Sequence, residues 1–169
     1  MTPYLVTAPA AQPVSLAEMK AHLRVAHSDD DTDISAKIAG VTAHLDAWGG
    51  ALGRCIMPQT WAVDATGRGP HLLPFPEASD VAVTGVSGPL DATVKRSFAG
   101  PLVTVADAAD DEELVIEFQS GMDAARLPAA QSLIKLMVQR EFDALSGPEA
   151  MATDSAIAAL MNSLRWRRV

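Results

Sequence analysis

The chain has 169 residues and a formal net charge of -8, with 49% hydrophobic and 5% aromatic residues. A chain of this length fits one domain and can bury a mainly aliphatic core without disulfides or metal ions to stabilise it. The acidic balance excludes tight nucleic-acid binding by the chain as a whole, because affinity for phosphates comes from Lys and Arg.

The first 14 residues contain three prolines and predict an extended arm. They have neither the positive start nor the apolar centre of a secretory signal peptide. No run of about eighteen apolar residues occurs in the sequence, so we expect a soluble protein made in the cytoplasm, with no membrane partner.

Residues 15–53 carry the pattern of a helical hairpin. Ser15, with Glu18 three positions later, predicts an N-cap and a capping box for the first helix. In the second helix, apolar residues recur at steps of four and three, and glycines end the pattern. These apolar positions are Ile34, Ile38, Val41, Leu45, Trp48 and Leu52.

Turn residues recur from residue 57 to 122 and separate short stretches that are typical of strands. The stretches are 59–65, 81–86, 93–98, 102–106 and 113–118, and the apolar "CIMP" before them predicts a buried Cys55. We therefore expect an α+β fold, in which a small, mostly antiparallel sheet is inserted between the second and third helices of an α-helical bundle.

A third helix is expected over residues 127–146, because Pro128 suits a first helical turn and an apolar stripe follows it. The stretch "SGPE" predicts its end. A short helix from about residue 154 then leads into the basic end "RWRRV", so that residues 154–169 complete a single domain over residues 1–169.

The acidic run "HSDDDTD" raises the question of a metal site. Asp29, Asp31 and Asp33 match positions 1, 3 and 5 of a calcium loop. Such a loop also needs Gly at position 6 and Glu at position 12, where the chain has Ile34 and Gly40. The run instead predicts a helix start, with Asp29, Asp30 or Asp31 as the cap of the second helix.

Other constellations for chemistry are weaker still. Ser120 lies in "FQSGM", which lacks the G-x-S-x-G elbow of a nucleophilic serine. The four histidines include no HxxxH pair, and "GRG" lacks the Lys of a phosphate loop. We therefore expect no enzymatic activity, no metal and no cofactor.

The order of these segments resembles the phage head–tail connector family, also called adaptor or head-completion proteins, of tailed phages and gene transfer agents. The resemblance runs through nearly the whole chain. Its stretches are "PVSLAEMKAHLRV", "LGRCIMPQTW", "LLPFPEASDVAVTGV", "LVIEFQSGM", "LPAAQSLIKLMVQREF" and "SAIAALMNSLR". Each is a packing or turn signature, and their shared order and spacing carry the resemblance.

The resemblance implies a structural role at the head–tail interface of a virion or phage-like particle. Members of this family form a homo-oligomeric ring under the portal protein, typically of about twelve copies. The ring extends the channel through which double-stranded DNA passes. It also offers a surface to the stopper or tail-terminator protein and performs no chemistry.

The segment from Leu164 to Val169 is the expected portal-docking element. Trp166 would be its apolar anchor, and Arg165, Arg167 and Arg168 would meet acidic groups of the portal. The same residues also fit a solvated tail or a nucleic-acid contact.

Two alternatives to the adaptor remain open at this point. One is a metal-dependent hydrolase that uses Asp29, Asp31 and Asp33, and it predicts binding of divalent ions. The other is a DNA-binding module that acts through the basic tail, and it predicts steeply salt-dependent affinity for DNA.

Overall fold

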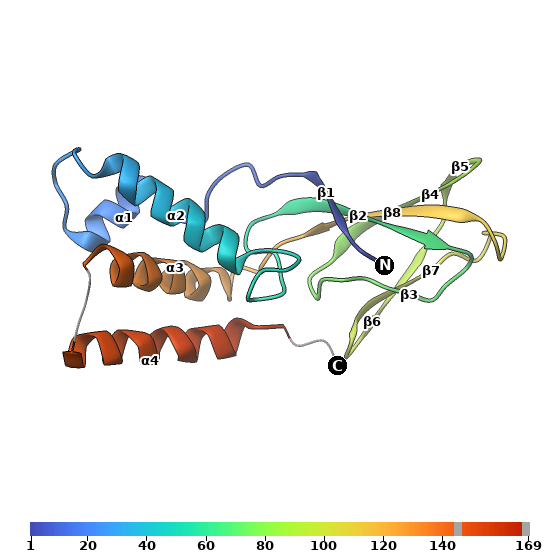
Figure 1. Ribbon diagram of the computed structural model, residues 1–169. Helices are drawn as coiled ribbons and strands as arrows, with labels where there is room; N and C mark the ends of the chain where they lie inside the picture. The colour runs from blue at the N-terminus through green and yellow to red at the C-terminus, as the bar shows by residue number, and fades with distance from the viewer. Residues whose placement is uncertain (144–146, 167–169) are drawn as a thin grey trace. The chain divides into compact units, whose positions relative to one another are not determined.

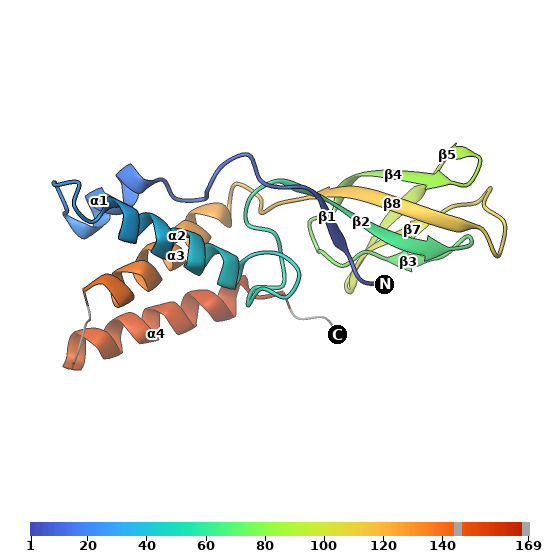
Figure 2. The same cartoon turned by 45° about the horizontal axis from the view of Figure 1, so that its top comes forward.

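The computed structural model describes residues 1–143 and 147–166 and has a mixed α+β fold (Figures 1 and 2). The chain forms two compact units. The β unit comprises residues 1–10, 57–122 and Trp166, and the helical unit comprises residues 11–56 and 123–165. Within the described residues, none of the helices combines the length and the apolar character that a membrane span requires.

The helical unit contains four helices in the described chain: α1 (Leu16–Leu23), α2 (Asp31–Leu45), α3 (Leu127–Phe142) and α4 (Gly147–Leu164). Helix α3 packs against each of the other three, and α1 also packs on α2. The side chains that they bury include Met19, Ile34, Ile38, Val41, Leu45, Leu133, Ile134 and Val138. The apolar periodicity of the sequence therefore corresponds to the faces on which the helices pack.

Helix α2 ends at Leu45, about two turns before the predicted end of its apolar pattern. Asp46 leaves the helical conformation with ψ of 150°, and its Oδ1 accepts a hydrogen bond of 2.6 Å from the backbone N–H of Ile56. The loop then turns back, so that the N–H of Leu52 donates to the carbonyl of Leu45. Leu52 is fully buried by this return of the chain rather than by a longer helix.

Helix α4 begins at Gly147, well before the predicted start near residue 154. Pro148 is its second residue, where the missing N–H of proline leaves no hydrogen bond unmade. Gly147, Pro148 and Glu149 therefore lie in the first turn of this helix rather than ending the helix before it, because proline is compatible with a first helical turn.

Within the described residues, the β unit holds eight strands in two antiparallel sheets. The observed β region is therefore larger than the small sheet that the sequence predicts. The five-stranded sheet has the order β1 (Tyr4–Thr7), β2 (Gln59–Thr66), β8 (Glu113–Ser120), β4 (Ser79–Gly85) and β5 (Gly88–Leu90). The three-stranded sheet has the order β3 (His71–Leu72), β7 (Gly100–Thr104) and β6 (Thr93–Ser97).

An aromatic cluster lies in the core of the β unit. Phe75 contacts Trp61 edge to face, with ring centroids 5.3 Å apart, and Phe118 at 6.1 Å. Along β8, buried and exposed residues alternate, and Phe118 belongs to the buried set with Leu114, Ile116 and Ser120. This alternation gives the sheet one packed face and one outer face, as expected for an antiparallel sheet.

The predicted N-terminal arm is extended, but it is not free. Residues Tyr4–Thr7 form strand β1, which pairs with β2 in the register Tyr4 to Ala62 and Leu5 to Trp61. The sequence alone predicts no strand here, because three prolines in 14 residues argue against regular pairing. The prolines lie at positions 3, 9 and 13, outside the paired residues.

The start of helix α1 has a capping box. The backbone N–H of Glu18 donates to Ser15 Oγ at 3.3 Å, and Glu18 Oε2 accepts from the backbone N–H of Ser15 at 2.9 Å. The backbone hydrogen bond from Ser15, followed by the bond from its hydroxyl, lowers the pKa of Glu18. Both ends of the capping box are therefore made.

We predict that Ser15→Ala lowers the free energy of unfolding by about 1 kcal/mol at neutral pH. Because the pKa of Glu18 is lower in the folded chain, its contribution is present above the unfolded pKa and is lost as the pH falls through the folded pKa. The difference between the variant and the wild type should therefore shrink in acid. Urea titrations at several pH values measure it, and Ser35→Ala in the exposed middle of α2 is the control.

Candidate interaction surfaces

The carboxylates of the acidic run point to different partners. Asp31 pairs with Lys20 of α1, and Asp33 pairs with Lys37 at 3.3 Å. The Asp29 carboxylate is exposed and lies 4.0 Å from His27. In residues 1–143 and 147–166, no three His, Cys, Asp or Glu side chains are grouped closely enough to hold a metal ion. The three aspartates of the hypothetical hydrolase are thus not brought together.

The expected side-chain cap of α2 is absent. Asp30 occupies the N-cap position, but its φ of -94° and ψ of 2° differ from the extended backbone of a capping residue, and its side chain makes no capping hydrogen bond. Asp31 is the first helical residue and is bonded to Lys20 instead. Asp31 and Asp33 lie in the first turn, where negative charge complements the helix dipole.

The basic C-terminal segment is described as far as Trp166. Leu164 is 3% exposed at the end of α4, so its side chain is occupied within the fold. Arg165 is exposed and its Nε donates to the carbonyl of Ala51 at 2.9 Å, while Trp166 is half-buried. Arg167, Arg168 and Val169 lie outside the described residues. The start of the segment is thus anchored to the helical unit by Leu164 and Arg165.

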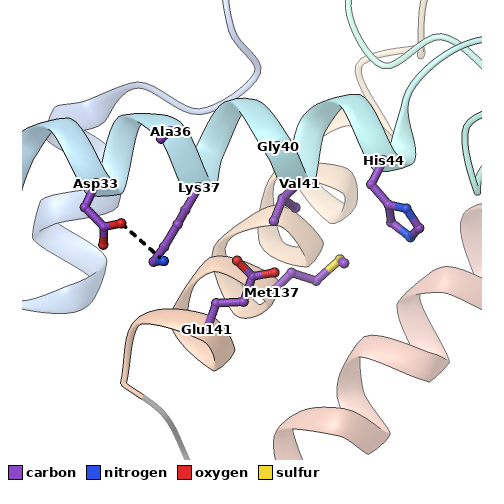
Figure 3. Close-up of a pocket in the computed structure, with 8 residues that line it drawn as sticks. All are labelled: Asp33, Ala36, Lys37, Gly40, Val41, His44, Met137 and Glu141. Atoms are coloured by element: carbon purple, nitrogen blue, oxygen red, sulfur yellow. Dashed lines mark ion pairs between the residues drawn. The ribbon is translucent and has the colours of Figure 1, made fainter.

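A groove of about 530 Å³ runs between α2 and α3 in the helical unit. Figure 3 shows Asp33 and Lys37 paired at one end, His44 at the other and Glu141 on the facing helix α3. None of its lining residues has a hydroxyl or thiol group that could act as a nucleophile. The other residues of the lining are Ala36, Gly40, Val41 and Met137.

The outer face of the five-stranded sheet is acidic. Asp64 of β2 lies beside Val115, and Glu113 and Glu117 flank Val115 on the same face of β8. The hydroxyl of Tyr4 donates to Asp64 Oδ1 at 3.3 Å. Partial burial, then the negative charge of Asp64 and its hydrogen bond, raise the pKa of Tyr4. We call Asp64, Glu113 and Glu117 the acidic sheet face.

Sequence reasoning did not identify the acidic sheet face. The signal was present, because residues at i, i+2 and i+4 of a strand share one face, and "ELVIE" begins and ends with glutamate. The third carboxylate, from Asp64, comes from a strand about 50 residues earlier, and only the register of β2 with β8 reveals that it is a neighbour.

Comparison with solved structures finds a similar fold over the whole chain. One similar chain belongs to the neck of an empty GTA particle computed with C6 symmetry, where GTA denotes a gene transfer agent. The alignment covers 100% of this chain and 97% of the other, with a TM-score of 0.71 and 18% sequence identity. At this identity the likeness establishes the fold. No protein-family model and no curated protein matches the sequence.

Proposed function

We propose that this chain is a structural adaptor of a phage-like particle, one that forms a ring under the portal, extends the DNA channel and joins head to tail. The observation that carries the proposal is the fold likeness to a neck chain, which covers 100% of this chain and 97% of the other. The order of sequence segments that resembles the head–tail connector family supports the same role. The proposed partners are the portal, the stopper or tail-terminator protein and other copies of the chain.

The charge of the β unit suits a channel for DNA. The segment Met57–Met122 contains ten Asp and Glu residues and three Lys and Arg residues. Repeated around a ring of about twelve copies, this excess creates a strongly negative field. A negative wall repels phosphates, so that DNA passes without adhering. We propose that the acidic sheet face contributes to such a wall.

Portal docking is assigned to the end of the chain from Trp166 onward. Leu164 is buried and Arg165 bonds to Ala51, so both residues also serve the fold. Trp166 retains exposed surface and is followed by two arginines. Arg and Trp are the residue types that carry much of the binding energy at protein interfaces. The docking element that we propose is therefore Trp166–Val169, the outer part of the segment Leu164–Val169 that the sequence suggests.

Deletion of residues 166–169 tests this role. The truncated chain keeps Leu164 and Arg165, and we expect it to fold normally but to lose attachment to portal-bearing heads. Co-sedimentation of the purified chain with tailless heads measures attachment, and circular dichroism checks the fold.

Matched variants at residues 167 and 168 separate charge from length. Replacing Arg167 and Arg168 by Lys keeps both charges and should retain most attachment, whereas replacing both by Glu should abolish it. Normal attachment by the truncated, folded chain would remove the C-terminal segment from the docking site. If heads lacking this protein acquired tails normally, the adaptor role itself would be wrong.

A further inference from the structure

Strand β1 is an unprotected edge of the five-stranded sheet. It pairs with β2 on one side and is the outermost strand of that sheet (Figure 1). Tyr4, Leu5 and Val6 are 43%, 46% and 47% exposed, and no charged side chain occurs before Glu18. Soluble proteins usually protect such edges with charge, proline or a covering segment. An apolar edge without these features fits a strand that another chain covers.

Strand β6 is an edge of a different kind in the same unit. It is the outermost strand of the three-stranded sheet, and Val94, Lys95 and Arg96 are all exposed. Phe98, in the turn that follows, is 80% exposed. Neither Lys95 nor Arg96 forms an ion pair within the described part of the chain. Two such strands would repel each other, since like charges would lie side by side.

The two edges are complementary in charge. The outer face beside β1 carries Asp64, whose Oδ1 accepts a hydrogen bond from the Tyr4 hydroxyl, and Glu117; after burial, their negative charge raises the pKa of Tyr4. A strand added to β1 would lie about 5 Å beyond it and roughly 10 Å from β2. The extended side chain of Lys95 or Arg96 and the carboxylate of Asp64 can span that distance together. Apolar groups also match when Val94 lies beside Leu5, because Lys95 then lies on the opposite face of β6, the side on which β2 carries Asp64.

We propose that β1 of one copy pairs with β6 of the next copy, which joins the five-stranded sheet of the first to the three-stranded sheet of the second. The contact uses two different surfaces of the chain, so the copy whose β1 has paired still has a free β6, and the copy whose β6 has paired still has a free β1. Such head-to-tail contacts form closed rings when the rotation between copies closes. The inference rests on the proposed ring and names the contact that builds it.

Mixtures of variants that each carry one added cysteine test the pairing in the full chain. Leu5→Cys, Val94→Cys and Val86→Cys each place a thiol on an exposed apolar position, and the native Cys55 is fully buried in all three. Under mild oxidation, the mixture of Leu5→Cys with Val94→Cys should form a covalent heterodimer. Leu5→Cys mixed with Val86→Cys, whose residue lies in the turn between β4 and β5, should not.

Two other results of the cross-linking experiment would contradict the pairing of β1 with β6. Dimers of Leu5→Cys with itself, at a yield equal to the mixed pair, would indicate a two-fold β1–β1 contact and overturn the proposal. Absence of the mixed heterodimer over all concentrations would also overturn it. The adaptor role is tested in a separate experiment, by attachment of the chain to heads, so the two proposals can fail independently.

Charge reversal supplies a second measurement on the same pair. Lys95→Glu with Arg96→Glu in the Val94→Cys chain should suppress the mixed heterodimer. Asp64→Lys with Glu117→Lys in the Leu5→Cys chain should restore it. Suppression without restoration would show that charge is not what selects β6 as the partner of β1.

Discussion

Phe75→Ala should lower the free energy of unfolding by about 3–5 kcal/mol, the range for removing a buried aromatic side chain. Phe75 is fully buried and lies between the rings of Trp61 and Phe118. Its loss removes both ring contacts and leaves a cavity that the strands on either side cannot easily fill. Chemical denaturation followed by tryptophan fluorescence measures the change, since Trp61 contacts the site directly.

Phe98→Ala is the matched control, because the same substitution then removes a side chain that is 80% exposed. It should change the free energy of unfolding by less than about 0.5 kcal/mol. A loss of similar size in both variants would show that Phe75 does not hold the core of the β unit together.

The sequence pattern predicts those helices and strands that bury one face against the core. In α2 the apolar residues Ile34, Ile38, Val41 and Leu45 recur at helical spacing and are buried, and β8 alternates over its whole length. Such periodicity is a direct consequence of packing one face against a core. The main strands of the β unit were therefore placed within a few residues of their observed bounds.

Elements that depend on distant partners were not predictable in the same way. Strand β1 forms because β2, more than 50 residues later, offers a free edge, and its own four residues are all exposed. The burial of Leu52 likewise results from a loop that returns to α2. In both places the local sequence pattern predicts either no element or the wrong one, because tertiary contacts decide the conformation.

The candidate surfaces, like the helices and strands, depend partly on tertiary contacts that the local sequence does not show. From sequence, Asp29, Asp31 and Asp33 are close neighbours, yet their side chains leave the chain in different directions and bind different partners. Asp64 and Glu117 are distant in sequence, yet both lie on one sheet face near Tyr4. Proximity of charges in the sequence therefore does not by itself bring carboxylates together, whereas sheet register brings together charges that are distant in the sequence.

Gly67→Ala should lower the free energy of unfolding by about 2–4 kcal/mol, because backbone strain at a positive φ and a steric clash of the new Cβ combine. Gly67 follows β2 with φ of +72°, and a Cβ there would lie 2.5 Å from the carbonyl oxygen of Asp110. Its N–H also donates to the carbonyl of Glu112 at 2.9 Å, so the turn cannot move away without losing that bond.

Gly49→Ala separates the backbone strain from the steric clash. Its φ of +86° is similar, but no atom lies within 4 Å of its Cβ position, so only backbone strain of about 1–2 kcal/mol is expected. The difference between the variants, measured by denaturation, reports the clash with the acidic loop at residues 110–112. Equal losses would mean that this loop moves aside freely. A larger loss at Gly67 would mean that the loop is held against the β2 turn, which fixes the position of the negative charge that the proposed channel presents to DNA.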